Sequence, residues 1–448
     1  MRVDRPHPWL SLALLAAFAA APARAEGPDS TGQGLPSELG LPQAEEIFLA
    51  RGLDLLIAEA GVRGAEGDLT AAGAHPNPNF QPTLYYVPST TKDVLYGNLG
   101  GNASSEVWGL GLALDDNAAI EDQLSGKRSL RIEFAAKALA AAKLNVKDIQ
   151  RTELSQLRQA YVAAVMAKLN AEAAKETFET YDRQLKLSQK QFEAGAIGRL
   201  DLSQMATSQL EALQALATAN AGFGQAVASL LYLLGVRGRR PAVALTSAID
   251  YRPLPAIEGT TFDALVGDAE KNRTDVRIAE RNLEQAQVAV RQAKRAVLPD
   301  VALNAGYSEI CNGGTCSSAP GFNFGLSGNL PILYWQQGEI RRAESNVTAA
   351  ERALEKARAQ VLSDVSQAWA GYAAAREQIE RMQDKLIAEA KLARDLAQIQ
   401  YQKGAASLVS FLFAERTYVA AELEYHQDLA NYWSSVFQME QATNLTLH

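Results

Sequence analysis

The feature that most constrains the fold is an internal duplication. Residues 53–59 resemble residues 274–280, and residues 192–196 resemble residues 401–405, each pair in the same order along the chain. A duplicated order of short matches means that one supersecondary unit occurs twice. The sequence therefore predicts two structural repeats of similar fold.

The repeats divide the chain unevenly. The first runs from about 41 to 237 and the second from about 261 to 445. Residues 238–260 join them and are rich in proline and glycine, which favours an irregular linker in the equator of the molecule.

The first residues have the composition of an export signal. Arginines precede an apolar run at 9–21, and Ala-Arg-Ala at 23–25 has the pattern of a cleavage site. We expect residues 1–25 to be a signal peptide and residues 26–40 to be a flexible segment. An uncleaved anchor is the alternative, and the apolar run is short for a transmembrane helix. The absence of a cysteine near the site argues against a lipid anchor there.

The pattern of each repeat predicts a helix, two strands, a very long helix, a break at glycine and another helix. The seam of the second long helix alternates steps of four and three residues, at Val361, Val365, Ala368, Tyr372, Ala375 and Ile379. This spacing is typical of a coiled coil. The element, from about 338 to 404, would span about 100 Å at 1.5 Å per residue.

The strands alternate apolar and small polar residues. Phe322, Phe324 and Leu326 alternate with Asn323 and Gly325, and the predicted hairpins cover about 80–114 and about 300–332. Period-two alternation with small polar residues on one face is typical of a transmembrane barrel. The alternative is an ordinary amphipathic hairpin on a soluble sheet.

The number of strands limits how they can cross a membrane. Four strands cannot close a barrel, because bacterial barrels need at least about eight. Open strand edges are not tolerated in lipid. If the strands lie in a membrane, several chains must share one barrel, although the sequence alone does not fix how many.

Several short motifs, in duplicated order, resemble the outer-membrane efflux protein (TolC-like) family over nearly the whole chain after the signal. The motifs are 41–46, Asn77-Pro78, Leu298-Pro299, 329–332 with Gly338, and the tip segments 195–202 and 401–412. The sequence departs from the family where Thr274 replaces a usual proline and where Asp115-Asp116 ends the first hairpin.

The resemblance implies a mainly α-helical chain with a small β part. Long coiled-coil hairpins would form an α-barrel tunnel in the periplasm, and four transmembrane strands per chain would complete a twelve-stranded β-barrel in a homotrimer. It also implies an outer-membrane location in a Gram-negative cell, and two partners: a periplasmic adaptor (membrane fusion) protein and an inner-membrane pump. The pattern at 425–440 favours a pump of the resistance-nodulation-division type.

The implied function is a passive exit duct that exports small solutes, either drugs or metal cations. One alternative is the exit duct of a type I protein secretion system. Another is a periplasmic coiled-coil scaffold or adaptor, which leaves the alternating strands unexplained. The chain is not expected to be an enzyme, because it lacks G-x-S-x-G, P-loop and H-E-x-x-H motifs. The net charge of −8 argues against nucleic acid as a partner.

Two cysteines are the only candidates for covalent cross-linking. Cys311 and Cys316 flank Asn-Gly-Gly-Thr between two predicted strands, and an exported chain meets an oxidising compartment. We expect a disulfide that closes a surface loop outside the cell, with two free thiols as the alternative. His426 lies on a helix seam, where a satisfied packing histidine is expected rather than a metal ligand. We expect no metal site and no cofactor.

The two glycine turns are the remaining candidate sites. The resemblance places Gly195-Ala196 and Gly404-Ala405 at the periplasmic tip of the tunnel, where the adaptor would dock. Family members often have an acidic ring after the second turn, and this sequence has none at the matching positions. The candidate aperture residues are instead Arg199, Asp201, Ser410 and Phe413.

The hypothesis for the aperture assigns one role to each kind of residue. Phe413 would form an apolar constriction, and Arg199 with Asp201 would hold neighbouring helix pairs closed. The alternative is that Asp201 caps a helix and that Arg199 is solvated.

Overall fold

The chain was analysed as a computed structural model. The structure describes residues 35–36, 38–87, 107–236, 244–246, 249–254, 259–312, 315–316 and 321–446. The predicted signal peptide at 1–25 lies outside these ranges, as does most of the segment at 26–40.

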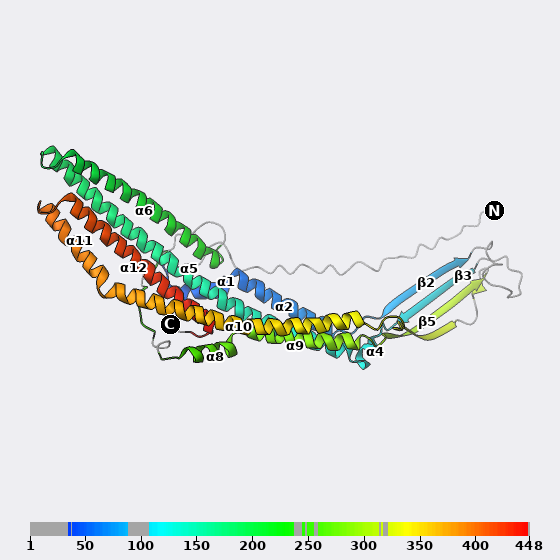
Figure 1. The fold of residues 1–448 in the computed structure, drawn as a ribbon. Helices are drawn as coiled ribbons and strands as arrows, with labels where there is room; N and C mark the ends of the chain where they lie inside the picture. The colour runs from blue at the N-terminus through cyan, green and yellow to red at the C-terminus, as the bar shows by residue number, and fades with distance from the viewer. Residues whose placement is uncertain are drawn as a thin grey trace, which may run out of the picture.

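The molecule is elongated, with a sheet at one end and two helical hairpin tips at the other (Figure 1). The first repeat contains α1 (Leu41–Arg51), α2 (Leu53–Gly73), β2 (Asn79–Val87), β3 (Val107–Asp115), α4 (Ala119–Leu124), α5 (Lys127–Glu193) and α6 (Arg199–Leu233). The second contains α8 (Phe262–Asn272), α9 (Thr274–Arg295), β5 (Val301–Asn312), β6 (Thr315–Cys316), β7 (Gly321–Gly328), α10 (Gln337–Arg381), η2 (Met382–Leu386), α11 (Ile387–Gln402) and α12 (Leu408–Thr443). This composition confirms the predicted fold class, long helical hairpins with a small β part.

The long helix of the second repeat is not continuous, contrary to the expectation from its seam. A five-residue π-helix, η2, separates α10 from α11, and the chain bends there (Figure 1). A π-helical turn adds a residue without ending the helix. In the sequence the apolar spacing continues at Met382 and Leu386, which is why spacing alone did not reveal the break; in the structure Met382 is buried, whereas Leu386 is exposed. The matching helix of the first repeat, α5, runs unbroken for 67 residues.

Part of the segment that was expected to be flexible is held in place. Glu38–Leu39 forms a short parallel ladder, β1, with Ala244–Leu245, β4. Tyr161 of α5 secures the ladder, because its hydroxyl donates to the carbonyls of Leu39 and Thr246, each at 3.1 Å. The N-terminal residues before the first repeat are therefore tied to the equatorial linker and to the longest helix.

The sheet is antiparallel, in the order β2-β3-β5-β7. Directly opposed residues in such a sheet share a face. The register pairs Leu84 with Leu110 and Leu112 with Tyr307, so the apolar positions of all the strands lie on one side. The large or apolar residues of this apolar face are Phe80, Leu84, Tyr86, Trp108, Leu110, Leu112, Leu114, Leu303, Ala305, Tyr307, Phe322, Phe324 and Leu326. The pattern has one charged exception, Glu309, which lies opposite Leu110 on this face, while Ile310 lies on the other face.

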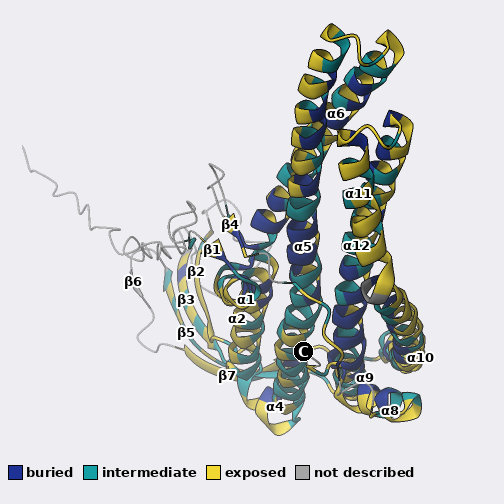
Figure 2. Cartoon of the chain, turned by 90° about the vertical axis from the view of Figure 1, so that its left-hand side faces the viewer, coloured by how far each residue is buried: buried dark blue, intermediate teal, exposed yellow. Residues whose placement is uncertain are grey.

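The apolar face is uncovered within one chain. Phe324 is 83% exposed, and the other large apolar side chains of this face that lie on β7 and β2 are also exposed. The main core lies elsewhere, between the helices, where Figure 2 shows the buried residues along the inner sides of α5 and α12. In the described part of the chain, no helix is both long enough and apolar enough to cross a membrane.

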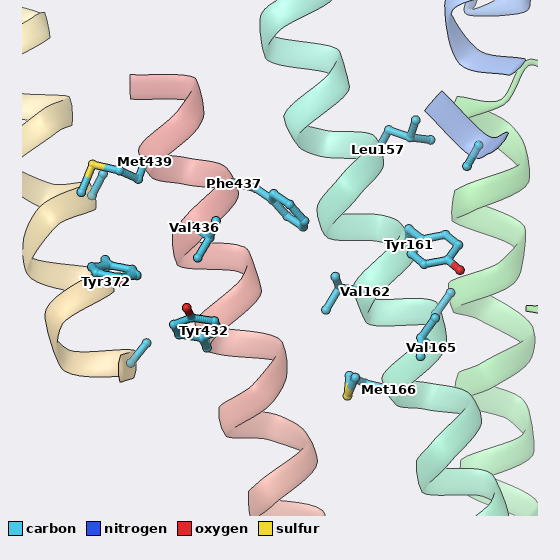
Figure 3. Close-up of a cluster of buried hydrophobic side chains, with 14 of the residues drawn as sticks. Leu157, Tyr161, Val162, Val165, Met166, Tyr372, Tyr432, Val436, Phe437 and Met439 are labelled. Carbon is cyan, nitrogen blue, oxygen red and sulfur yellow. The ribbon is translucent and has the colours of Figure 1, made fainter. Parts of the chain in front are cut away.

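The core joins the two repeats through the contact of α5 with α12, and the contact of α12 with α10 extends it within the second repeat. Figure 3 shows Val162 and Met166 of α5 on the side that faces α12, whereas Tyr161 and Val165 point to the opposite side of α5. Tyr432 of α12 is fully buried, and its hydroxyl donates to the carbonyl of Arg252 at 2.6 Å. Because the residues come from both repeats, neither repeat can complete this core alone.

A buried arginine fixes the junction of α8 and α9. Arg273 is 3% exposed and contacts Asp275 at 2.7 Å and Asp364 of α10 at 2.8 Å. Hydrogen bonds from its guanidinium hold the pKa of Asp275 below its usual value, against the opposite effect of burial. The two ion pairs of Arg273 therefore tie α8 and α9 to the long helix α10.

We predict that Arg273→Met destabilises the protein, because it leaves two carboxylates without their cation. The side chains of Asp275 and Asp364 are 28% and 32% exposed. We expect a loss of roughly 2 kcal/mol, below the roughly 3–5 kcal/mol of a fully buried pair. Arg352→Met, which removes an exposed pair with Glu355, is the matched control. Equal unfolding temperatures for the two variants would contradict the prediction.

Candidate functional site

The two helical tips have the same turn. Gly195 and Gly404 have φ angles of 70° and 71°, which glycine adopts without strain. The next amide closes each helix: Ala196 donates to the carbonyl of Gln191, and Ala405 donates to that of Gln400, both at 2.8 Å. These are the bonds of a glycine C-cap, so the matched sequences form matched ends of the two hairpins.

The helices that leave the two turns are capped differently. Ser407 caps α12 by accepting the amide of Ser410 at 3.2 Å, and the two hydroxyls lie 2.9 Å apart. Ser410 is thus part of a cap. Gly198 stands at the N-cap of α6 without a side-chain bond, and Asp201 lies in the first turn. Its negative charge there suits the helix dipole, but it is not the cap that the alternative reading proposed.

The structure brings the candidate aperture residues to the tips but does not join them. In the part of the chain that the structure describes, Arg199 and Asp201 form no ion pair. Phe413 is 73% exposed, one helical turn after the exposed Val409. The second hairpin therefore presents apolar side chains near its tip.

Contacts between the two hairpins come from residues that the sequence did not single out. Arg416 of α12 pairs with Glu211 of α6 at 3.0 Å, and Arg394 of α11 lies 3.7 Å from Glu176 of α5. The pair of Arg416 with Glu211 is exposed on both sides and contributes about 0–1 kcal/mol, whereas Arg394 is largely buried and its guanidinium also lies over the ring of Tyr418. These pairs join helices of different repeats, so intrahelical spacing gave no signal for them.

A small core lies behind these ion pairs. Tyr181, Met205, Tyr401 and Phe411 form a cluster separate from the main core. The rings of Tyr401 and Phe411 stack at 5.5 Å, and the Tyr401 hydroxyl lies 3.4 Å from that of Ser188. The cluster joins α5, α6, α11 and α12 within the distal part of the hairpins.

Buried oxygen atoms without hydrogen bonds adjoin this small core. Among the described residues they include Oε1 of Gln184 and Oε2 of Glu415. Glu415 is 2% exposed, and burial raises the pKa of its carboxyl group. The nearby carboxylates of Glu176, Asp395 and Glu422 add to the rise, and Arg394 opposes it. A buried polar group without a partner costs about 1–3 kcal/mol, so this part of the hairpins is packed less favourably than the main core.

The sheet supplies the other candidate surface. The side opposite the apolar face is uncharged along the described middle of the strands, at Gln81, Thr83, Tyr85, Gly109, Gly111, Ala113, Asn304, Gly306, Ser308, Asn323, Gly325 and Ser327. Tyr85 lies across Gly109, where a methyl group would overlap its ring. Its ring therefore lies along the sheet instead of projecting from it.

The remaining predicted residues have structural surroundings. The backbone register places Cys311 opposite Cys316, the only other cysteine of the chain, and Cys311 is disulfide-bonded. His426 is half-buried, with Nδ1 2.7 Å from Oδ1 of Asn170, and burial lowers the pKa of its imidazole. Within the described ranges, no group of potential metal ligands occurs.

We predict that Glu415→Gln stabilises the tip at neutral and alkaline pH. A carboxyl group whose pKa is raised by folding stabilises the fold below its unfolded pKa, and this stabilisation is lost as pH rises through the folded pKa. The gain should be roughly 1 kcal/mol at about pH 8 and should vanish at about pH 4.

The measurement is hydrogen exchange of α11 and α12 at the two pH values. Glu424→Gln, an exposed position on the same helix, is the control. A pH-independent difference between Glu415→Gln and the parent would contradict the role given to this carboxyl group.

Comparison with known proteins assigns the chain to a family. The model of the family described as outer membrane efflux protein matches residues 46–236 and 265–445, one segment in each repeat. The pyoverdine export outer membrane protein OpmQ of Pseudomonas aeruginosa is 24% identical over 403 residues, covering 86% of this chain and 81% of that protein.

Two further proteins extend the likeness. The nickel and cobalt resistance protein CnrC of Cupriavidus metallidurans is 27% identical over 320 residues, covering 71% of this chain and 69% of that protein. The crystal structure of the CmeC outer membrane channel of Campylobacter jejuni is similar in fold, with a TM-score of 0.76 at 19% identity, over 90% of this chain and 85% of that one.

The family match covers both repeats, including the turns at the two hairpin tips. The fold is similar to that of a solved outer membrane channel. The expected outer-membrane location and the expected kind of function are therefore confirmed, and the scaffold reading is replaced. The chain belongs to the outer membrane efflux protein family and is an efflux channel protein of the outer membrane.

Proposed function

We propose that the chain is one third of a homotrimeric, passive exit duct of a tripartite efflux pump that exports small solutes. The observation that carries this is the sheet: one face is apolar apart from Glu309, the opposite face is polar and uncharged along the middle of the strands, and within the described residues the sheet does not close on itself. An apolar outside and a polar inside are what a water-filled barrel in lipid requires.

Closure of the barrel requires further copies of the chain. In the described part, β2 and β7 each pair on one side only. Unpaired edges are too costly in a bilayer to be left open. Three chains with four long strands each give twelve strands, which lies within the range of known barrels.

The exposed apolar side chains of the helices also support a trimer. Within one chain α6 packs on α5, α5 on α12, and α12 on α11. The helices at the two ends of this row keep exposed large apolar side chains: Leu210 and Leu213 on α6, and Leu392, Leu396 and Ile399 on α11. In the proposed trimer α11 of one chain packs on α6 of the next, which covers both stripes and closes a tunnel.

The proposed partners are a periplasmic adaptor at the turns Gly195-Ala196 and Gly404-Ala405, and an inner-membrane pump of the resistance-nodulation-division type. The exposed tips support the adaptor site, and the sequence pattern at 425–440 supports the pump class. A duct whose wall carries no nucleotide motif needs a partner to supply energy.

The cargo is proposed to be drugs or metal cations. The names of two relatives refer to pyoverdine export and to nickel and cobalt resistance. Pyoverdine and these metal cations are chemically unlike solutes. An uncharged barrel wall supports passage of either kind. The exit duct of a type I protein secretion system is the second candidate, since a tunnel of this length would serve it equally.

Deletion of the gene separates the two candidates. The proposal expects increased sensitivity to nickel, cobalt or organic toxicants, restored by the gene on a plasmid. Loss of a secreted protein without any change in sensitivity would instead support the type I duct.

We predict that the protein purified in detergent is a trimer. Mass measurement of the protein–detergent complex, corrected for bound detergent, is the test. A monomer that still fractionates with the outer membrane would contradict shared closure of the barrel.

We predict that Phe413→Ala raises single-channel conductance in a planar bilayer, because removing an exposed aromatic ring at the tip widens an apolar constriction. Ser366→Ala, which removes a hydroxyl bonded to its own helix on α10, is the control in the tunnel wall and should leave conductance unchanged. An intact trimer with parental conductance in Phe413→Ala would remove Phe413 from the aperture.

The closing role proposed for Arg199 and Asp201 requires a neighbouring chain. Since these residues form no ion pair with each other in the described chain, we propose that they pair between chains at the closed tip. A conductance rise in Asp201→Asn that Arg199→Gln reproduces would support this pairing.

A further inference from the structure

The strand-to-helix junction of the second repeat carries an unusual density of exposed apolar side chains. The junction segment, 330–335, follows β7 and precedes α10. Its exposed residues are Leu330, Ile332, Leu333, Tyr334 and Trp335, and Leu333 is 97% exposed. Contiguous apolar exposure of this kind marks a surface that another phase or molecule covers.

Hydrogen bonds fix the junction segment in this conformation. The amide of Ile332 donates to the carbonyl of Leu330 at 2.9 Å. The hydroxyl of Tyr334 donates to Glu339 and accepts the amide of Gly338, each at 2.8 Å. The apolar side chains are therefore displayed by a built turn at the start of α10.

The junction segment lies next to the end of the apolar face of the sheet. Phe322, Phe324 and Leu326 alternate along β7 on that face, β7 ends at Gly328, and Leu330 follows two residues later. The free edge of β7, which the proposed trimer pairs with the next chain, lies in the plane of the sheet. The apolar face points away from that plane, so the position of the junction segment next to this face favours lipid over a second chain as the cover.

The first repeat has a similar feature at the matching place. Helix α4 lies between β3 and α5 and exposes Ile120 and Leu124, the latter by 82%. The duplication thus places exposed apolar residues after the second long strand of each repeat. Next to the junction segment, Arg341 and Arg342 are exposed on α10, where cations can contact lipid phosphates.

We propose that the junction segment and the apolar side of α4 lie in the phospholipid leaflet that faces the periplasm, at the boundary of headgroups and acyl chains. Tyrosine and tryptophan favour this depth, because each has an apolar body and a polar group. The inference rests on the proposed barrel, whose apolar face must already be in lipid. If the proposal holds, these residues form a membrane anchor outside the barrel strands, and this anchor fixes the depth of the barrel in the bilayer.

The test uses fluorescence quenching in vesicles of phosphatidylethanolamine and phosphatidylglycerol. Leu333→Cys is labelled with an environment-sensitive dye, and the vesicles contain phospholipids that carry a quencher either near the headgroup or deep in the chain. Phe324→Cys on the apolar face and Glu351→Cys on exposed α10 are the references. Disulfide-bonded Cys311 does not compete for the dye.

The expected result is strong quenching of the Leu333 dye by the headgroup-level quencher, of the Phe324 dye by the deep quencher, and of the Glu351 dye by neither. If the Phe324 dye is quenched and the Leu333 dye is not, the anchor is wrong and the barrel stands. If an intact trimer shows no quenching at Phe324, the proposed barrel itself is wrong.

A second measurement does not depend on the label. In the parent protein, brominated phospholipids should quench part of the tryptophan emission, and Trp335→Phe should remove part of that quenched emission. An unchanged quenched fraction in Trp335→Phe would place Trp335 outside the bilayer and overturn the anchor.

Discussion

The packing of α5 against α12 is the contact on which the rest of the chain depends. The two helices belong to different repeats, and their shared core includes Val165 and Tyr432 as well as residues of α10. Because Tyr161 of the same core also fixes the β1–β4 ladder, the middle of the molecule is tied in several directions. The sheet and the tips extend from this middle in opposite directions (Figure 1), so their separation follows from one packed region.

The quality of packing falls from the middle toward the tips. The main core is apolar and buries large side chains, whereas the distal cluster is small and adjoins the unpartnered oxygens of Gln184 and Glu415. The exposed pair Arg416–Glu211 adds little stability. Such a gradient lets the distal hairpins separate without unfolding the middle, which suits a duct whose end must open.

Much of the fold followed from the sequence because its signals are periodic. Alternation of period two gave the strands, and the register shows that residues such as Leu112 and Tyr307 share a face. The matched tip glycines gave the turns. The π-helix at Met382–Leu386 could not be predicted, since the apolar spacing of the sequence continues at both residues, although in the structure Met382 is buried and Leu386 is exposed. The ion pairs between hairpins, such as Arg416 with Glu211, join residues 205 positions apart, and neither repetition nor helical spacing encodes such a pairing.

The interruption of one long helix by η2 makes the two halves of the chain mechanically unequal. α5 is one unbroken helix, whereas α10 and α11 are two segments that meet at a bend. In the proposed trimer the hairpins around the tunnel would therefore alternate between two kinds and would have threefold symmetry only. An adaptor that docks at the tips would meet two different binding sites, one on each kind of hairpin, so each adaptor subunit must bind both kinds or only one.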